Sequence, residues 1–155
     1  MKRYIRGANK TTKGTKKTLP KPITIIINKV LPVILLIVAG FFFIPYASMN
    51  FQNNDVKGLN TNAEAVMFYS STCSHCQKVY PKIFWHNVLN FNNDDKQIQT
   101  INVQNPNNKH YISDFAVQET PTFMKPNNPD MKLVSTDVKQ INSFAETGAN
   151  DQWKI

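Results

Sequence analysis

Residues 30–46 form the longest uncharged apolar stretch of the chain, and this stretch has no polar face. An apolar helix of about 20 residues crosses the hydrocarbon core of a bilayer, whereas a core helix of a soluble protein shows only an apolar stripe. Pro32 falls in the first turn of such a helix, where its missing N–H matters least. The pattern therefore predicts a membrane-spanning helix over residues 30–47.

Positive charge is concentrated before this stretch. Nine of the 18 Lys and Arg residues precede the first acidic residue, Asp55, and the remaining nine are balanced by ten acids. The formal net charge of +8 therefore belongs to the tail of residues 1–29, and it does not indicate a nucleic-acid partner. Because basic flanks stay in the cytoplasm, we expect the tail inside and the residues from about Ser48 onward outside the cytoplasm.

A cleaved signal peptide is the alternative to a membrane anchor. The basic tail is long, the apolar run exceeds a usual h-region, and Ala47 and Ser48 make a poor small-residue cleavage site. These features favour an uncleaved anchor that contacts lipid. The sequence thus predicts a single-pass protein of the cell membrane with an extracytoplasmic C-terminal domain.

The residues after the anchor divide into a linker and one small domain. Residues 48–62 are polar, Asn-rich and aperiodic, which is typical of a linker. Residues 63–155 have room for a single core. Hydrophobic periodicity predicts strands at residues 65–69 and 97–103, a hairpin of residues 122–124 and 132–135 with its turn at 127–130, and helices at 74–91, 107–116 and 138–146. This order predicts an α/β domain with a small mixed sheet between helices.

The helical spacing also predicts which side chains face the core. They are Val79, Ile83, Phe84, Val88 and Phe91 in the first helix, Tyr111, Ile112 and Phe115 in the second, and Ile141, Phe144 and Ala145 in the third.

The only two cysteines, Cys73 and Cys76, lie between the first predicted strand and the helix that follows it. A cysteine at a helix N-terminus gains thiolate character from the unpaired N–H groups there. A structural zinc site would need a second ligand pair, for which only His86 and His110 are available, and a structural disulfide across so short a loop would stabilise little. The pair therefore favours a redox dithiol, and we expect neither a metal nor a cofactor.

Residues 63–146 resemble the thioredoxin superfamily in four separate features. These are the strand-CxxC-helix order, Pro81 eight residues after Cys73, the strand and turn of residues 101–106, and the segment of residues 115–123 with its Thr120-Pro121 pair. The resemblance implies a trimmed thioredoxin-like fold that lacks the opening strand and helix of the full fold.

The same resemblance implies roles for individual residues. Cys73 would be the attacking thiolate and Cys76 the resolving thiol. His75, placed as in the Cys-Pro-His-Cys motif of Dsb-type disulfide oxidases, would stabilise the Cys73 thiolate. Pro121 would follow a cis peptide bond, and the Thr120 backbone would pair with an extended substrate segment.

Three positions depart from the family pattern. Met67 stands where thioredoxins have a buried acid that moves protons to the second thiol, Tyr69 replaces a tryptophan, and Ser74 replaces the glycine of Cys-Gly-Pro-Cys. The aromatic residues Tyr69, Phe84, Trp85 and Phe123 are interpreted as core rather than as a peptide groove.

The sequence thus predicts a bacterial, membrane-anchored enzyme, a thiol-disulfide oxidoreductase acting on exported thiol or disulfide proteins or peptides. Whether it oxidises, reduces or isomerises stays open. Because the predicted span has no cysteine, the enzyme would need a separate redox partner. The alternative is a redox-inactive thioredoxin-like binding module, or an accessory of an export or transfer machine.

Overall fold

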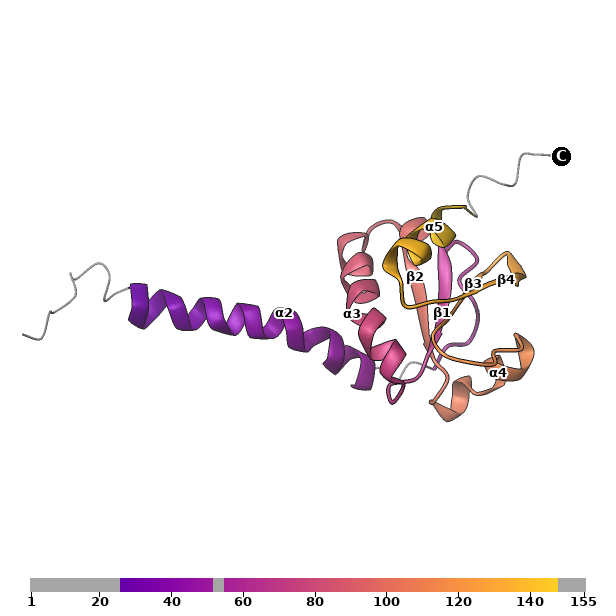
Figure 1. The fold of residues 1–155 in the computed structure, drawn as a ribbon, viewed down its shortest axis with the longest axis horizontal. Coiled ribbons are helices and arrows are strands. Elements are labelled where there is room, and N and C mark those ends of the chain that lie inside the picture. Colours follow the sequence, from indigo (N-terminus) through magenta and orange to yellow (C-terminus); the bar gives the residue numbers. More distant parts are fainter. Residues whose placement is uncertain (1–25, 52–54, 148–155) are drawn as a thin grey trace, which may run out of the picture. The chain divides into compact units, whose positions relative to one another are not determined.

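The computed structural model describes residues 26–51 and 55–147 (Figure 1). Most of the basic tail, residues 1–25, lies outside the described residues, as do residues 52–54 and 148–155. The chain divides into two compact units, residues 1–37 and residues 38–155.

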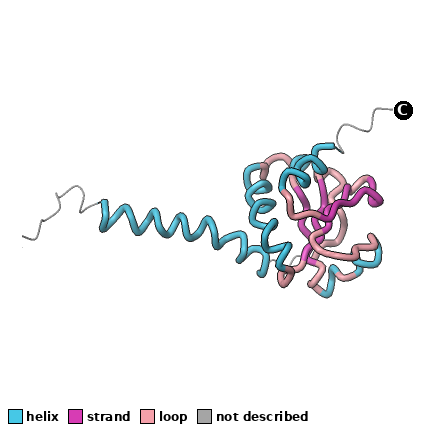
Figure 2. The backbone as a smooth tube through the Cα atoms, viewed as in Figure 1, coloured by secondary structure: helices cyan, strands magenta, loops and turns pink. Residues whose placement is uncertain are grey.

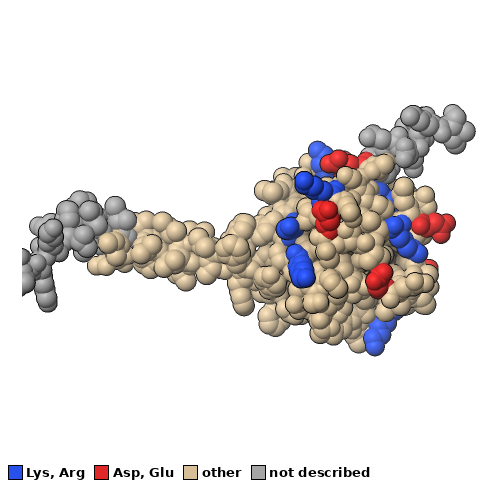
Figure 3. Space-filling model, in the orientation of Figure 1, with Lys and Arg blue, Asp and Glu red and all other residues tan. Residues whose placement is uncertain are grey.

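The apolar stretch is helical, as its pattern predicts. A π-helical turn, η1 (Ile26–Val30), leads into the α-helix α2 (Leu31–Phe51), and the apolar helix Ile27–Phe51 is long enough to cross a membrane. Figure 3 shows no charged side chain on the visible face of α2, whereas both signs of charge are spread over the domain. The helix continues through Pro45 and ends at Phe51, four residues beyond the predicted end of the span at residue 47.

The domain is built on a four-stranded mixed sheet in the order β2-β1-β3-β4. Its strands are β1 (Ala65–Tyr69), β2 (Ile98–Asn102), β3 (Thr122–Lys125) and β4 (Asn128–Val134). β1 runs parallel to β2 and antiparallel to β3, which in turn pairs antiparallel with β4. Helices flank this sheet (Figure 2), so the predicted small mixed sheet between helices is confirmed.

The helices are α3 (Ser74–Leu89), α4 (His110–Asp114) and α5 (Val138–Thr147), with single 3-10 turns at η2 (Asp94–Lys96) and η3 (Pro106–Asn108). All five residues of β1 are buried, and their alternating side chains face two separate clusters. Met67 and Tyr69 belong to the cluster that contains Ile83 of α3 and Ile141 of α5. On the other face Val66 and Phe68 pack with Tyr111 of α4 and with Ile101, Val103, Val117 and Met124.

Three predicted core positions are wrong. In α3, Val79 and Ile83 are buried as predicted, but Val88 and Phe91 are exposed. The helix ends at Leu89, where the backbone N–H of Asn90 donates to carbonyls of the preceding turn, so the helical period stops before Phe91. Ile112 is 40% exposed because α4 is a single turn, in which only Tyr111 and the position four residues later share the inward face.

The hairpin turn also differs from its prediction. It lies at Pro126 and Asn127, because Lys125 pairs directly with Asn128, and not at residues 127–130. Pro129 is therefore inside β4, at an irregularity in the register that separates the Lys125–Asn128 pair from the Met124–Lys132 pair. A proline has no N–H to donate, and an edge strand with a bulge is where a sheet tolerates one.

Part of the predicted linker lies against the domain. Val56 and Leu59 pack on the cluster around Phe68, and the buried side chain of Asn108 accepts the N–H of Val56 at 3.0 Å. The hydroxyl of Tyr111 donates to the carbonyl of Val56 at 3.0 Å. These contacts fix the chain entry into β1 on the face opposite α3.

Candidate dithiol site

Cys73 is the N-cap residue of α3, directly after the loop that leaves β1. Its backbone N–H donates to the Ser70 carbonyl at 3.2 Å, which closes the turn between strand and helix. Its Sγ accepts the N–H of Cys76 at 3.4 Å, in the place where an N-cap side chain satisfies an otherwise unpaired donor. The strand-to-helix position inferred from the sequence is therefore the one that the structure has.

The pKa of Cys73 lies below its ordinary value. Burial by itself raises it, but hydrogen bonds with the Thr120 side chain and with the backbone of Cys76 and His75 outweigh that effect. These groups favour the thiolate of the half-buried sulfur.

The second thiol has the opposite environment. Cys76 is fully buried one turn into α3, in the cluster with Met67, Val79 and Phe123. Burial raises the pKa of Cys76 to about 12, and the neighbouring Cys73 thiol adds to the rise, while a hydrogen bond with the Ser70 backbone opposes it. Both thiols are free in this structure.

The structure brings Thr120 and Pro121 to the dithiol. The Thr120–Pro121 peptide bond is cis, as predicted from the resemblance. The Cys73 Sγ–H donates to the Thr120 carbonyl oxygen at 3.1 Å, and Thr122, next along the chain, opens β3. Residues 47 positions apart therefore meet at one edge of the site.

His75 lies in the first turn of α3 with its side chain exposed. Among the described residues no hydrogen bond or ion pair of its imidazole is present. Its backbone is one of the groups that lower the pKa of Cys73. Position 75 therefore acts on the sulfur through its main chain in this geometry.

Two tyrosines that sequence reasoning did not assign to the site lie beneath Cys76. The rings of Tyr69 and Tyr80 are 4.8 Å apart, and both residues belong to the buried cluster that contains Cys76. Burial, together with Tyr80 and Cys76, raises the pKa of Tyr69. The spacing of four residues between Cys76 and Tyr80 puts them on one helix face, which is the signal that could have found them.

Met67 occupies the position at which the family pattern has an acid, and it is fully buried. The groups that shift the pKa of Cys76 are Ser70, Cys73 and Thr120, and none of them is a carboxylate.

The described residues, 26–51 and 55–147, contain no group of three or more His, Cys, Asp and Glu side chains that could hold a metal ion. The two histidines considered as zinc ligands contact backbone carbonyls elsewhere: His86 Nε2 lies 2.7 Å from the Lys96 oxygen and His110 Nδ1 lies 2.9 Å from the Asn107 oxygen.

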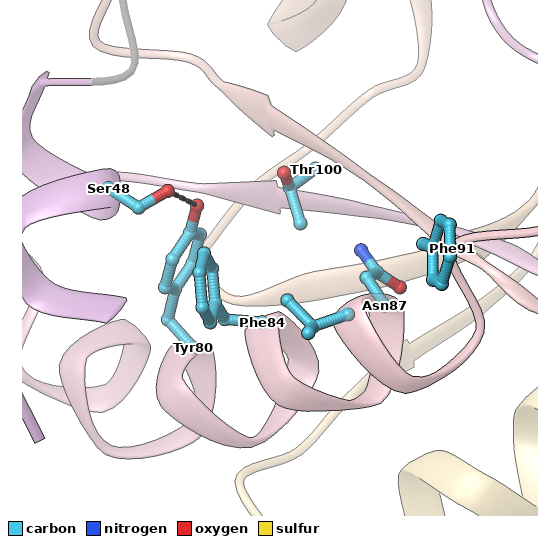
Figure 4. A pocket seen from close by; sticks show the side chains of 7 residues that line it. Ser48, Tyr80, Phe84, Asn87, Phe91 and Thr100 are labelled. Atoms are coloured by element: carbon cyan, nitrogen blue, oxygen red, sulfur yellow. Dashed lines mark hydrogen bonds between the residues drawn. The ribbon is translucent and has the colours of Figure 1, made fainter. Parts of the chain in front are cut away.

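A pocket of about 270 Å³ lies beside α3, at the edge of the sheet formed by β2 (Figure 4). Tyr80, Phe84 and Asn87 of α3 line it, together with Thr100 of β2 and Ser48. Ser48 Oγ and Tyr80 Oη are 3.4 Å apart across it, as the dashed line in Figure 4 shows. Neither cysteine lines this pocket, so the pocket is not part of the dithiol site.

The arrangement described above is that of a thioredoxin-type domain: a mixed sheet, a CxxC at the start of a helix and a cis-proline beside it. Comparison with family models agrees, because the family model described as Thioredoxin matches residues 44–147, which is more than half of the chain. The chain therefore belongs to the thioredoxin family. No curated protein and no solved structure matched the chain in similar comparisons.

Proposed function

We propose that this protein is a thiol-disulfide oxidoreductase, anchored in the cell membrane, whose domain acts outside the cytoplasm. The observation that carries the proposal is the opposite perturbation of two thiols three residues apart. The pKa of Cys73 is lowered and that of Cys76 is raised to about 12. In such a pair, the sulfur of lower pKa is suited to act as nucleophile and as leaving group, and the other sulfur stays protonated until the second step.

The reaction follows from this asymmetry. The Cys73 thiolate attacks one sulfur of a substrate disulfide, which forms a mixed disulfide and releases the other substrate sulfur as a thiolate. Cys76 then loses its proton and attacks Cys73 Sγ, which closes the Cys73–Cys76 disulfide and releases the second substrate thiol. Two electrons pass from the dithiol to the substrate, and the reverse sequence oxidises a substrate dithiol.

Thr120 offers a link between the chemistry and substrate binding. Its carbonyl accepts the Cys73 S–H in the reduced protein, and a thiolate or a disulfide sulfur has no proton to donate. Loss of that proton frees the carbonyl to accept a backbone N–H of an extended substrate segment, as in strand addition. Ionisation of Cys73 and binding of the substrate backbone would then favour each other.

The location outside the cytoplasm rests on the apolar helix and its flanks. The helix Ile27–Phe51 is long and apolar enough to span a bilayer; eight of the nine basic residues that precede Asp55 come before this helix, and Lys29 lies in its first turn. Basic flanks are retained in the cytoplasm, which leaves the domain on the other side. Exported proteins with thiols or disulfides are then the substrates in reach, and a separate redox partner must renew the dithiol, because the chain has only two cysteines.

A trapping experiment tests the redox function. Cys76→Ser removes the resolving thiol, so it should accumulate covalent, reductant-sensitive adducts between Cys73 and extracytoplasmic proteins. Cys73→Ser is the matched control and should trap few or none. If Cys76→Ser traps nothing and the double Cys→Ser variant keeps full biological activity, the chain is a redox-inactive binding module instead.

Protease added to intact, wall-stripped cells tests the topology separately. It should remove the domain and spare the N-terminal tail. A domain that resists protease until the cells are lysed would reverse the orientation.

A further inference from the structure

The exposed apolar side chains of the domain are concentrated at one place. Among described residues 55–147, six large apolar side chains are exposed, and three of them fall within four positions at the end of α3: Val88, Leu89 and Phe91, the others being Ile112, Met131 and Val134. Leu89 is 82% exposed and Phe91 is 71% exposed. Such a concentration indicates an interaction site rather than chance exposure.

This surface is continuous with the apolar helix that precedes the domain. The half-buried ring of Trp85 stacks on Phe41 with 4.3 Å between ring centroids and 10° between planes. Phe84 meets Trp85 edge to face at 5.2 Å. Phe41 lies six residues, about 9 Å, before the predicted end of the membrane span at residue 47, so a ring stacked on it lies near the outer end of that span.

A second contact sets the direction. Ser48 lies beside Tyr80, whereas Phe41, about 10 Å further toward the N-terminus of the span, lies beside Trp85. Moving along α3 toward its C-terminus therefore corresponds to moving along the apolar helix toward the bilayer interior. Val88 and Leu89 continue in that direction.

We propose that the C-terminal half of α3, with Trp85, Val88, Leu89 and Phe91, rests in the interfacial layer of the bilayer that holds the anchor. This inference depends on the membrane anchoring in the proposed function. Trp is a typical residue of the membrane interface, where its ring is half in apolar surroundings. The driving force is burial of the apolar side chains in lipid.

The charges around this surface do not favour anionic lipid strongly. Three lysines and two acids are exposed along α3 and the η2 turn that follows it: Lys78, Lys82, Lys96, Asp94 and Asp95. They leave one net positive charge near the headgroups, so attachment should not require anionic lipid.

This attachment would position the dithiol. Cys73 caps the first turn of α3, and Leu89 ends the same helix 16 residues later, which corresponds to about 24 Å along the axis. The lipid-bound end would thus keep the catalytic end away from the membrane surface. Tethering alone would leave that distance free to vary.

Fluorescence quenching in vesicles tests the inference. The full chain with Trp153→Phe has Trp85 as its only tryptophan and is reconstituted in phosphatidylcholine vesicles. Brominated phosphatidylcholine should quench Trp85 at least twofold, while aqueous iodide should have little effect. Replacing part of the lipid by phosphatidylglycerol should leave the quenching unchanged.

Two variants make the result specific. A control chain with Trp85→Phe, Trp153→Phe and Ile112→Trp places the probe on α4, on the other face of the sheet; there iodide should quench and brominated lipid should not. In the chain with Trp85 alone, Leu89→Asn with Phe91→Asn should reduce quenching by brominated lipid. Unchanged alkylation of Cys73 in each variant verifies that the domain is folded.

Each outcome decides the question. Quenching of Trp85 by brominated lipid in chains that float with the vesicles supports the inference. Floating chains in which iodide alone quenches Trp85 overturn it without affecting the anchor or the redox function. Trp85 shielded from both quenchers overturns it in favour of a second protein copy on this face. Chains that do not float overturn it together with the anchor.

Discussion

The two thiols of the site should differ greatly in reactivity at neutral pH. A thiol with a pKa of about 12 is ionised to about 1 part in 10⁵ at pH 7, whereas one at the ordinary value of 9.0 is ionised to about 1%. The pKa of Cys73 lies below that value, so its thiolate is at least about 1,000 times more abundant than that of Cys76.

Intrinsic nucleophilicity opposes this advantage. The thiolate of higher pKa attacks faster by a factor of about 20 for three pKa units, which leaves a ratio of at least about 50 in favour of Cys73. Complete burial of Cys76 adds to the ratio, because the reagent has no access to its sulfur. The folded domain should therefore be alkylated at Cys73 almost exclusively.

The assay compares Cys76→Ser and Cys73→Ser, each with one remaining thiol, reacting with iodoacetamide between pH 6 and pH 10 and followed by mass spectrometry. The rate at Cys73 should level off below pH 9, while the rate at Cys76 should keep rising about tenfold per pH unit. In guanidinium chloride the two rates should become equal. Equal rates in the folded variants would refute the assigned asymmetry, and with it the division into attacking and resolving sulfur.

Three further results are expected. His75→Ala should raise the pKa of Cys73 only slightly, because the ring is exposed and screened while the backbone contribution stays; alkylation profiles measure this. Asn108→Ala should cost about 2–4 kcal/mol in urea unfolding and speed hydrogen exchange at the Val56 amide, since it leaves buried backbone groups without their partner. Burial lowers the pKa of Lys125, so the folded state binds this proton less tightly than the unfolded chain does. The free energy of unfolding should therefore increase as the pH rises from the folded pKa to the unfolded pKa. Lys125→Met should abolish this increase, measured against the wild type by urea unfolding from pH 7 to pH 11.

Sequence patterns predicted an element correctly where the local pattern fits only one secondary structure. The uninterrupted apolar run of β1 between polar segments predicts a strand buried on both faces, and the structure has it at the same residues. The turn after β3 could not be placed in this way. Residues 126–129, Pro-Asn-Asn-Pro, fit a turn in more than one register, and the choice depends on pairing between Lys125 and Asn128.

The candidate site shows the same limit. The position of the CxxC between a predicted strand and a predicted helix was enough to place Cys73 at the start of that helix. Away from the site, spacing could not show that Lys125, on β3, would be buried with its ammonium donating to the carbonyls of Glu64 and Ala145. That contact joins segments far apart in the chain, and no local pattern encodes it.

The proton of Cys76 is the remaining step in the chemistry. In the proposed reaction Cys76 must ionise to attack the mixed disulfide, yet Met67 supplies no carboxylate, and burial raises the pKa of the adjacent Tyr69 rather than lowering it. Among the described residues, none of the groups that shift the pKa of Cys76 is a carboxylate that could take the proton. The proposed reaction itself forms a base beside the site, the substrate thiolate released by the attack of Cys73. Resolution of the mixed disulfide would then be coupled to release of the substrate's first sulfur. A slow, buried Cys76 would prolong the covalent complex whenever that thiolate diffuses away.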